Sequence, residues 1–463
     1  MAYGTTIAAI STPSGKGGVA IIRISGDEAI SIAERVFYPK SKNPVSELTS
    51  RMQTWGDVVY GGEYIDDGML TVFRSPASYT GEDVVEISCH GGILVTRTVL
   101  EAILSAGASL AEPGEFTRRA FINGKLSLTE AEAVGDLLEA KSREQIRLSS
   151  AASRTRLSGA IAEIRGTLTE LLSSTFARID YPDEDLGDFT DEESLDRLYK
   201  VKNSLLRLIS TYPTGKAITE GVNTVLCGKT NVGKSTVYNS ILGEDAAIVT
   251  DIEGTTRDVL CRSVPLGRVM LNLSDTAGIR DGERADAVEK IGIDRTRAAI
   301  SGAELIISVF DGARAADSED ADLLALLSTV ECPKIALINK CELDSKFDLS
   351  LLATGFDCVI SASAKTNEGE MLSKLSDAVN ALFTDEKISV GNDAVVSSAR
   401  HNASLTRALT FVDAAIAAYS SGVYADAAAS EVERSLGAIA EIDGRAVSEE
   451  VVSDIFSKFC VGK

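Results

Sequence analysis

Residues 228–236 have the types and spacing that hold a phosphate group. The segment reads Gly228-Lys-Thr-Asn-Val-Gly-Lys234-Ser235-Thr236 and fits the pattern G-x-x-x-x-G-K-[ST]. The apolar run at 224–227 predicts a strand before it, and a helical pattern follows, which is the context that this pattern requires. Backbone amides and a helix N-terminus would face the phosphates. We therefore expect Lys234 to neutralise β- and γ-phosphate oxygens and Ser235 to ligate Mg²⁺.

Two further segments have residues that would respond to a γ-phosphate. Gly254-Thr-Thr-Arg-Asp258 lies on a polar loop, where Thr256 would coordinate Mg²⁺ when the γ-phosphate is present. Asp275-Thr-Ala-Gly278 follows the strand predicted for 269–273. Its Asp would hold the magnesium shell through a water molecule, and its Gly amide would sense the γ-phosphate.

Two more segments are suited to reading a guanine base. Asn339-Lys-Cys-Glu342 ends the strand predicted for 335–338, and Ser363-Ala-Lys365 follows the strand predicted for 358–361 and would close over the base. The five segments together predict a Ras-like P-loop GTPase domain. The expected nucleotide contacts are Asn231, Val232, Gly233, Lys234, Ser235, Thr236, Thr250, Asp251, Ile252, Glu253, Gly254, Thr255, Thr256, Asp275, Thr276, Ala277, Gly278, Asn339, Lys340, Cys341, Glu342, Ser363, Ala364 and Lys365.

Two positions depart from the usual GTPase pattern. The base-reading motif normally ends in Asp, whose carboxylate accepts two hydrogen bonds from guanine, but here it ends in Glu342. Either Glu342 makes the same pair of bonds or Asp344 takes its place. Ile279 stands where Ras-like proteins have the Gln that orients the attacking water. Because a hydrophobic side chain cannot orient water, a cation or another acid must supply the missing electrostatics.

Composition limits the class of protein. At roughly 150 residues per domain, 463 residues suggest about three domains. The net charge of −22 argues against non-specific binding of nucleic acid, so any such contact is local or shared with a partner. No run approaches the ~18 apolar residues of a membrane helix, and the first ten residues lack a signal-peptide pattern. The seven cysteines are scattered and there are two histidines, so a cytosolic protein without a cysteine zinc site, disulfide framework or histidine-rich metal site is expected.

The hydrophobic pattern and the frequency of turn residues change along the chain. Short apolar runs with glycine-rich turns predict strands at 7–10, 19–24, 69–73 and 84–87, and leucines at helical spacing predict two or more long helices between 127 and 208. Helical patterns resume at 405–419 and 427–442, so we expect a helical domain interrupted by an inserted α/β domain. Trp55 and the leucines of 137–172 are assigned to core and helix packing.

Motifs outside the nucleotide segments extend over essentially the whole chain. They are Thr12-Pro-Ser-Gly-Lys-Gly-Gly-Val19, Ile22-Arg23-Ile-Ser-Gly26, Tyr79-Thr-Gly-Glu-Asp83, Val85-Glu86, His90-Gly-Gly92, Pro113-Gly-Glu-Phe116, Arg119-Ala-Phe121, Asn123-Gly-Lys125-Leu126, Asp180-Tyr-Pro-Asp-Glu184, Ala247-Ile-Val-Thr250-Asp251 and Phe459-Cys-Val-Gly-Lys463. With these motifs and the nucleotide loop together, the sequence resembles the MnmE (TrmE) family of tRNA-modification GTPases.

The resemblance implies a multidomain α/β plus α fold. Residues 1–125 would form a tetrahydrofolate-binding, aminomethyltransferase-like domain that makes a homodimer; 126–217 and 384–463 would form a helical bundle domain; 218–383 would form the inserted GTPase domain. A 5-formyl- or 5,10-methylene-tetrahydrofolate would supply a one-carbon unit. The folate contacts implied by the resemblance are Arg23, Glu86, Lys125 and Lys463.

The resemblance also implies how hydrolysis is catalysed. In this family K⁺ stands in for an arginine finger, and the matching K⁺ positions are Asn231, Thr250, Ile252 and Thr255. A ring of oxygen atoms can replace the hydration shell of such a cation. The Mg²⁺ positions are Ser235 and Thr256. The family's water-orienting acid aligns with Glu289, which would be catalytic together with Lys234.

The function implied is K⁺-stimulated GTP hydrolysis in a heterotetramer with the flavoprotein MnmG. This complex would add an aminomethyl or carboxymethylaminomethyl group at C5 of the wobble uridine, U34, of certain tRNAs, in the cytoplasm and away from membranes. Alternatives are a ribosome-assembly GTPase switch without folate chemistry, a folate-dependent transferase acting alone, and a member that binds nucleotide but hydrolyses it poorly.

Two residues could be mistaken for catalytic groups. Cys460 is a motif residue, and only Lys458 and Lys463 stand near it in sequence to lower its pKa, so a packed or accessible thiol is favoured over a nucleophile. His90 follows Cys89, but adjacent residues on a strand point to opposite faces, which favours a structural role for His90 at a turn over a His–Cys pair.

Overall fold

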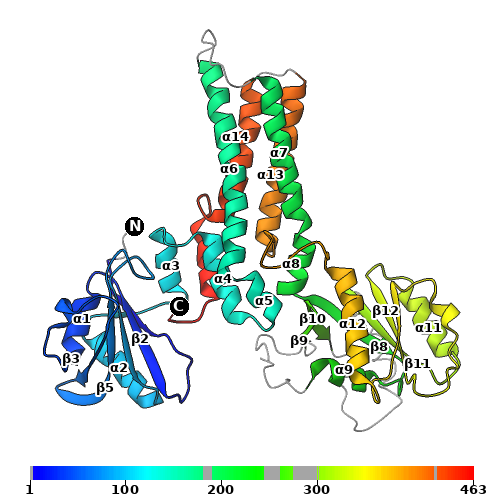
Figure 1. The fold of residues 1–463 in the computed structure, drawn as a ribbon, viewed down its shortest axis with the longest axis horizontal. Helices are drawn as coiled ribbons and strands as arrows, with labels where there is room; N and C mark the ends of the chain where they lie inside the picture. Colours follow the sequence, from blue (N-terminus) through cyan, green and yellow to red (C-terminus); the bar gives the residue numbers. More distant parts are fainter. Residues whose placement is uncertain are drawn as a thin grey trace. The chain divides into compact units, whose positions relative to one another are not determined.

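A computed structural model gives the fold and describes residues 4–180, 190–243, 261–274, 300, 302–421 and 425–462. The chain forms two compact units, Met1–Leu138 with Gly437–Lys463, and Glu139–Leu436. The first unit is therefore built from both ends of the sequence (Figure 1). No helix in the described ranges is both long and apolar enough to cross a bilayer.

The first unit contains a seven-stranded sheet in the order β3-β4-β5-β6-β2-β1-β7. Its strands pair in antiparallel fashion except for the β1–β7 pair, which is parallel. The strands are β1 (Ile7–Ile10), β2 (Val19–Ser25), β3 (Phe37–Pro39), β4 (Gln53–Tyr60), β5 (Glu63–Phe73), β6 (Val84–His90) and β7 (Ser109–Leu110).

Helices cover one face of this sheet. Alternate residues such as Ile22, Leu70 and Ile87 pack with Val36 and Val99 in one core, because successive side chains on a strand point to opposite faces. Val36 and Val99 belong to the two helices that supply the other half of this core. The helical elements of the unit's N-terminal part are α1 (Ala29–Val36), η1 (Val45–Glu47), α2 (Ile93–Ser105), α3 (Glu115–Ile122) and α4 (Leu128–Glu139).

The C-terminal segment completes the first unit. Phe456, on α15 (Glu449–Ser457), packs with Leu128 and Ala131 of α4. Val461 bridges to Pro113, and the Ser11 hydroxyl donates to the Gly462 carbonyl at 3.1 Å. Val461 and Gly462 therefore lie beside Pro113 and beside Ser11, the residue after β1.

Long helices form one part of the second unit. They pack through leucines at helical spacing, such as Leu168, Leu171 and Leu205, which are buried. In Figure 1, α6, α7 and α13 run side by side. The helices are α5 (Arg143–Leu148), α6 (Ala151–Asp180), α7 (Asp191–Ser210), α8 (Tyr212–Thr219), α13 (Ala399–Ser420) and α14 (Ala425–Asp443), of which the residues from Gly437 on belong to the first unit.

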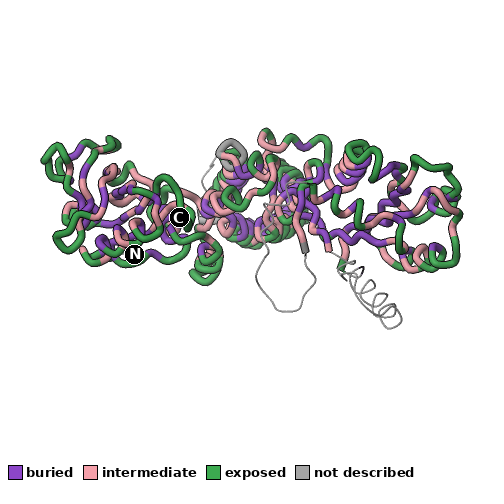
Figure 2. The backbone as a smooth tube through the Cα atoms, turned by 90° about the horizontal axis from the view of Figure 1, so that it is seen from below, coloured by how far each residue is buried: buried purple, intermediate pink, exposed green. Residues whose placement is uncertain are grey.

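A six-stranded sheet forms the other part, in the order β13-β12-β11-β8-β10-β9. All neighbours are parallel except β9 and β10. Its strands are mostly buried (Figure 2), as continuous apolar runs require when helices cover both faces of a sheet. The elements are β8 (Val222–Gly228), α9 (Lys234–Leu242), β9 (Cys261–Leu266), β10 (Val269–Ser274), β11 (Leu305–Asp311), α11 (Ser318–Leu327), β12 (Lys334–Asn339), η3 (Leu349–Leu352), β13 (Cys358–Ser361) and α12 (Glu368–Phe383).

The expectation for Trp55 is wrong. Its residue is 54% exposed on β4, on the sheet face opposite the α1–α2 core, where its indole N–H donates to Asp67 at 3.2 Å and Lys40 lies over its ring. Leu137 and Leu138 are also exposed, whereas most of the leucine stripe is buried as expected. A single aromatic residue does not reveal which face of its strand is covered.

Candidate functional site

The phosphate loop connects β8 to α9, as its sequence pattern requires. Gly228 (φ 145°) and Gly233 (φ 100°) have backbone angles that L side chains rarely adopt, and a Cβ at Gly233 would lie 2.2 Å from the Asn339 side-chain nitrogen. Glycine is therefore required here both for the turn and for the close approach of the base-reading loop. Asn231 is left-handed too (φ 63°), a conformation that Asn tolerates better than most residues.

Lys234 is held by the loop itself. Its ammonium donates to the carbonyls of Gly228 at 2.8 Å and Lys229 at 2.6 Å. Burial lowers the pKa of Lys234, since desolvation disfavours the charged form. An anion in the loop would offset that desolvation, so the arrangement suits a phosphate. Ser235 and Thr236, at the start of α9, are exposed and open to a ligand.

Asn339 joins three of the predicted nucleotide segments. The residue is 5% exposed at the end of β12; its amide donates to the Val232 carbonyl at 2.9 Å, and its oxygen accepts the Ala364 N–H at 2.9 Å. The phosphate loop, the base-reading loop and the 363–365 loop are thus tied together by one buried side chain. Buried hydrogen bonds of this kind are costly to leave unmade.

Lys340 makes a second tie to the phosphate loop. Its ammonium donates to the Asn231 carbonyl at 2.9 Å and pairs with Asp311 at 2.7 Å. The pKa of the Asp311 carboxyl is lowered by the hydrogen bond from Lys340, against the opposing effect of burial. Sequence reasoning missed Asp311, although an acid that ends the buried run of β11 is a usable signal, because it must have a partner.

Lys229 and Asp317 form a further contact that the sequence did not reveal. The Lys229 ammonium lies 2.5 Å from Asp317 and 3.2 Å from Glu319. Asp317 is the N-cap of α11 and also faces Arg314 at 3.3 Å. The hydrogen bond from Lys229 lowers the pKa of the Asp317 carboxyl to about 2.

Glu342 lies beside the loop that was expected to cover the base. A hydrogen bond from the Ser363 side chain is the main cause that lowers the pKa of the Glu342 carboxyl, and the charges of Lys365 and Lys340 act in the same direction. The carboxylate is exposed next to the 363–365 loop. Cys341 stays close to that loop as well, because its N–H donates to Ala362 at 3.4 Å.

The remaining expected positions around the nucleotide lie outside the described residues. They are Thr250, Asp251, Ile252, Glu253, Gly254, Thr255, Thr256, Asp275, Thr276, Ala277, Gly278 and Glu289. Of the expected K⁺ positions, Asn231 is therefore described, and of the Mg²⁺ positions, Ser235.

Arg23 and Glu86 meet on the sheet of the first unit. They are direct partners on β2 and β6, and the guanidinium lies 2.8 and 2.9 Å from one Glu86 oxygen. The Arg23 guanidinium also lies 5.4 Å from the centre of the Tyr79 ring and 5.6 Å from that of Phe116. An Arg held by a carboxylate and two rings is well placed to receive a planar or anionic ligand.

Lys125 contacts the loop at residues 76–81, which also contains the Tyr79 that lies against Arg23. Its ammonium donates to the Pro76 carbonyl at 2.9 Å, and a Cβ at Gly81 would lie 3.3 Å from its side chain. Lys125 and Arg23 therefore contact one loop at different places, since Tyr79 lies against Arg23 and Gly81 against Lys125. Lys463 lies outside the described residues, one position beyond Gly462.

The structure separates His90 from Cys89. Burial is the main cause that raises the pKa of the Cys89 thiol to about 11, whereas the His90 ring is 68% exposed and faces Asp66. The two do not form a His–Cys pair, in line with the sequence argument. Cys460 is an exposed thiol, and Lys458 pairs with Asp454 at 2.9 Å.

Comparison with known proteins covers nearly the whole chain. Residues 6–125 match the family model described as GTP-binding protein TrmE N-terminus, and residues 128–460 match the MnmE helical domain. The chain is 41% identical over 463 residues to the tRNA modification GTPase MnmE of Symbiobacterium thermophilum and 40% identical to that of Lysinibacillus sphaericus, with 99% of each chain covered. The expected combination of an N-terminal TrmE-type domain, a helical domain and an α/β nucleotide domain is confirmed.

Solved structures also align with the nucleotide part. The G domain of the T. maritima FeoB iron transporter is 24% identical and covers 35% of this chain and 98% of its own, with a TM-score of 0.26. Aquifex aeolicus Era bound to GDP and AlF₄⁻ is 20% identical and covers 41% of this chain and 66% of its own, with a TM-score of 0.27. At these TM-scores the likeness carries no argument of its own.

Proposed function

The chain belongs to the MnmE family of tRNA modification GTPases, and from this premise we propose how its residues carry out the reaction. The observation that carries the proposal is the buried Asn339 amide, which joins the phosphate loop to the two base loops. We assign GTP with Mg²⁺ to this site, within a nucleotide domain at 218–383 that interrupts a helical domain (126–217 and 384–463). A folate domain would occupy 1–125.

Lys234 and Ser235 would bind the phosphates and the Mg²⁺ ion. Lys234 already lies inside the loop, so it can exchange the carbonyls of Gly228 and Lys229 for phosphate oxygens without leaving its place. Ser235 presents an exposed hydroxyl at the N-terminus of α9. Mg²⁺, when bound, neutralises charge on the β- and γ-phosphates.

Glu342 is our choice for the residue that reads guanine. Its carboxylate lies beside Ser363 and Lys365, and the hydrogen bond from Ser363 lowers its pKa, which favours the charged, acceptor form. Asp344, two residues further along, is exposed. An acceptor at position 342 can therefore perform the role usually taken by Asp, with one additional methylene.

K⁺ is proposed to stimulate hydrolysis at a site that includes Asn231. The Asn231 side chain is exposed on the phosphate loop, and its left-handed backbone is fixed by the Lys340 bond to its carbonyl. Thr250, Ile252 and Thr255 would supply the other oxygens, and Glu289 would orient the attacking water. These four carry over from the family pattern.

GTP hydrolysis in KCl and NaCl at equal ionic strength tests this mechanism. We expect clear stimulation by K⁺ in the parent chain and its loss in Asn231→Gly, which removes the side-chain oxygen but accepts the φ of 63°. Asn231→Asp keeps an oxygen and serves as the matched control. Equal rates in the two salts for the parent chain would reject the K⁺ mechanism.

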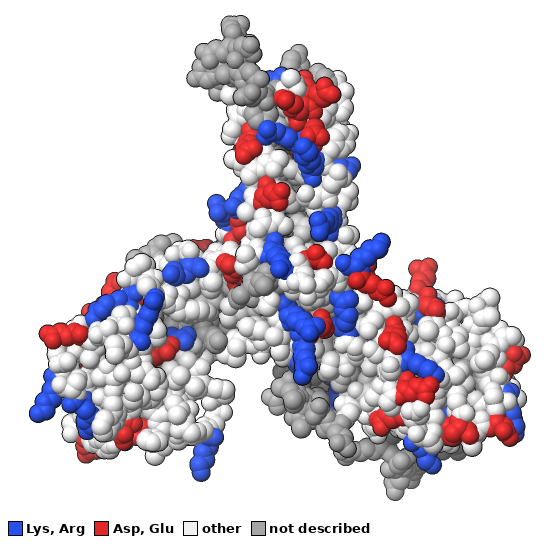
Figure 3. Space-filling model, in the orientation of Figure 1, with Lys and Arg blue, Asp and Glu red and all other residues white. Residues whose placement is uncertain are grey.

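The tRNA reaction is proposed to take place in a heterotetramer with MnmG, in the cytoplasm, with this chain as a homodimer. Acidic and basic side chains are interspersed on the face shown in Figure 3, so a partner is expected to supply much of the tRNA-binding surface. A 5-formyl- or 5,10-methylene-tetrahydrofolate would bind at Arg23, Glu86, Lys125 and Lys463 and supply the one-carbon unit to the wobble uridine.

Reconstitution tests this step separately. We expect modified uridine, detected by mass spectrometry of tRNA nucleosides, only when this chain, MnmG, GTP and the folate are all present. Modification without MnmG would instead support a folate-dependent transferase acting alone. Hydrolysis without any modification in the full mixture would support a GTPase switch.

A further inference from the structure

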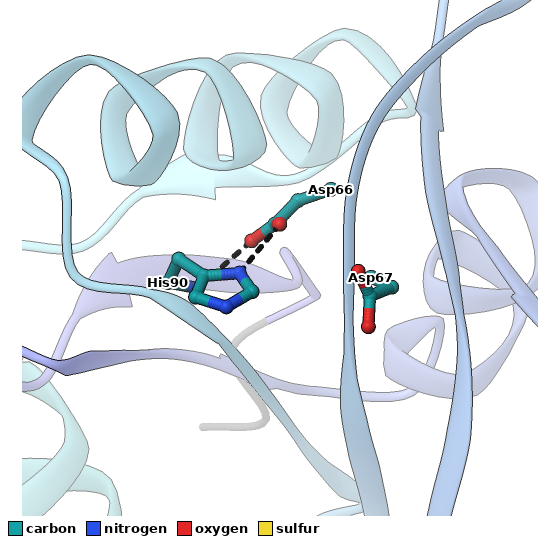
Figure 4. Close-up of side chains that lie close together, drawn as sticks. All are labelled: Asp66, Asp67 and His90. Atoms are coloured by element: carbon teal, nitrogen blue, oxygen red, sulfur yellow. Dashed lines mark hydrogen bonds and ion pairs between the residues drawn. The ribbon is translucent and has the colours of Figure 1, made fainter.

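Three side chains with metal-binding atoms meet on the first unit, away from the residues assigned above. Asp66 and Asp67 are neighbours on β5, and His90 ends the adjacent strand β6. One ligand atom from each lies within 4.8 Å of the other two. Figure 4 shows Asp66 and His90 facing each other, with Asp67 on the other side of the strand ribbon. Over the described part of the chain, this is the group with that property.

Asp66 is fixed by His90 twice. The residue is 7% exposed; one carboxylate oxygen accepts the His90 backbone N–H at 2.8 Å, and the other lies 2.7 Å from the ring Nδ1. The backbone contact alone positions the carboxylate. If a metal ion replaced the ring proton between Nδ1 and the second oxygen, the bond from the His90 backbone N–H would still hold the carboxylate in place.

Asp67 is positioned by two groups from outside the cluster. One of its oxygens accepts the Tyr64 hydroxyl at 3.0 Å, and the other accepts the Trp55 indole N–H at 3.2 Å. A carboxylate oxygen has further lone pairs beyond those used here. Hydrogen bonds from outer residues hold metal-ligating carboxylates in the same way, and they reduce the rearrangement that binding requires.

The surroundings favour a cation. The carboxylates of Asp66 and Asp67 bring two negative charges close to the His90 ring, since one ligand atom from each residue lies within 4.8 Å of the others. Lys40 lies 2.6 Å from Asp57, so its charge is directed there. The His90 ring is largely exposed, so an ion can reach it from solvent.

We propose that Asp66, Asp67 and His90 form a binding site for a divalent transition-metal ion of the Zn²⁺ class. An imidazole nitrogen with two carboxylate oxygens is a donor set suited to such ions, and three protein ligands leave a position for water. Neutral His90 would carry its proton on Nε2 and give the Nδ1 lone pair to the ion, whereas protonated His90 would release its Nδ1 proton to solvent. The ion would join β5 to the end of β6, within the first unit.

Zn²⁺ titration of the full chain tests the proposal, after chelator treatment and without nucleotide. We expect one ion per chain, bound at least tenfold more weakly in His90→Ala and in Asp67→Asn. Asp57→Asn is the matched control, because it removes a nearby acid that belongs to Lys40 and should leave the affinity unchanged. Circular dichroism shows that each variant is folded.

Histidine resonances give a second readout. The chain has two histidines, and His401 is buried on α13, so ¹⁵N-histidine labelling yields one exposed ring. We expect Zn²⁺ to shift the His90 signals and leave those of His401 in place. Blocking the thiols beforehand should not alter the affinity, since Cys341 and Cys460 are exposed but outside the site.

Three outcomes would overturn the site. Equal affinity in the parent chain and His90→Ala would place the ion elsewhere. Loss of binding after thiol blocking would assign it to cysteines. No binding up to millimolar Zn²⁺ would remove the site altogether. GTP hydrolysis by the same variants is expected to equal that of the parent chain, so failure of the metal site is distinguishable from failure of the proposed function.

Discussion

The two sheets of this protein bring functional side chains together in different ways. In the parallel sheet of the second unit, the phosphate loop follows β8, and Asn339 and Lys340 stand at the end of β12. The residues of each of these loops are consecutive in the sequence. In the antiparallel sheet of the first unit, Arg23 and Glu86 lie within strands and meet across a register of paired residues. A loop motif can be recognised in the sequence, whereas the pairing of residues on two strands, such as Arg23 with Glu86, is known only from the structure.

Asn339→Ala should have the largest effect on the parallel-sheet site. The change removes two buried hydrogen bonds and leaves the Ala364 N–H and Val232 carbonyl without this partner. At about 1–3 kcal/mol for each unsatisfied group, we expect GTP affinity to fall by roughly 100-fold or more. Calorimetric titration with GTP measures this loss; a fall of less than fivefold would show that the loops hold together without the amide.

Glu342→Gln should have the next largest effect, and it is specific to the base. Replacing the carboxylate removes a charge-assisted acceptor for guanine, so we expect roughly 10- to 100-fold weaker GTP binding. Asp344→Asn is the matched control and should bind GTP as the parent does. Competition between GTP and XTP measures the discrimination, and a loss confined to Asp344→Asn would transfer the role to that residue.

Arg23→Ala sharpens the comparison from the antiparallel side. We expect about tenfold weaker binding of 5-formyl-tetrahydrofolate, because the guanidinium that faces Glu86 and two rings is lost, while GTP affinity stays unchanged. Fluorescence titration with the folate measures it. Arg23→Lys keeps the positive charge but lacks the planar guanidinium with its paired N–H donors, so intermediate folate affinity is expected. Unaltered folate binding in Arg23→Ala would move the folate site elsewhere.

Asp317→Asn should have the smallest effect and shows it mainly at acid pH. The Asp317 pKa is lowered to about 2, below its unfolded value near 3.9. Its ion pair therefore stabilises the fold fully above pH 4, and that contribution is lost as the pH falls through about 2. The urea midpoint at pH 7 and pH 3 measures this. We expect the variant to lose less stability than the parent over that interval, and an equal loss in both would show that the Lys229 pair contributes nothing.

Much of the fold could be predicted from sequence, because hydrophobic pattern and turn residues encode it locally. The strands expected at 7–10, 19–24, 84–87 and 358–361 are confirmed by β1, β2, β6 and β13. β3, β4 and the helices α1 and α2 were not predicted, and Trp55 was assigned to the wrong face. Which side of a sheet is covered depends on helices far away in the sequence, so a strand's own pattern does not contain it.

The candidate-site residues also differ in whether the sequence alone could identify them. Asn339, Lys340 and Glu342 were named from their motif, and the structure places them beside the phosphate loop or the 363–365 loop. Asp311 and Asp66 were not named: the end of a buried run indicates that Asp311 needs a partner, but nothing near either residue in the sequence identifies its partner. Their importance comes from the partner that another strand delivers, Lys340 in one case and His90 in the other.

The bridge between Val461 and Pro113 has a consequence for the order in which the protein is made. The first unit needs Gly437–Lys463, and α15 packs on α4 from that segment. About 300 residues of the second unit leave the ribosome before it. At roughly 5–20 residues per second, the N-terminal sheet waits on the order of 15–60 s for its last helix. During synthesis the inserted unit can therefore finish folding while the unit that encloses it in sequence is still incomplete.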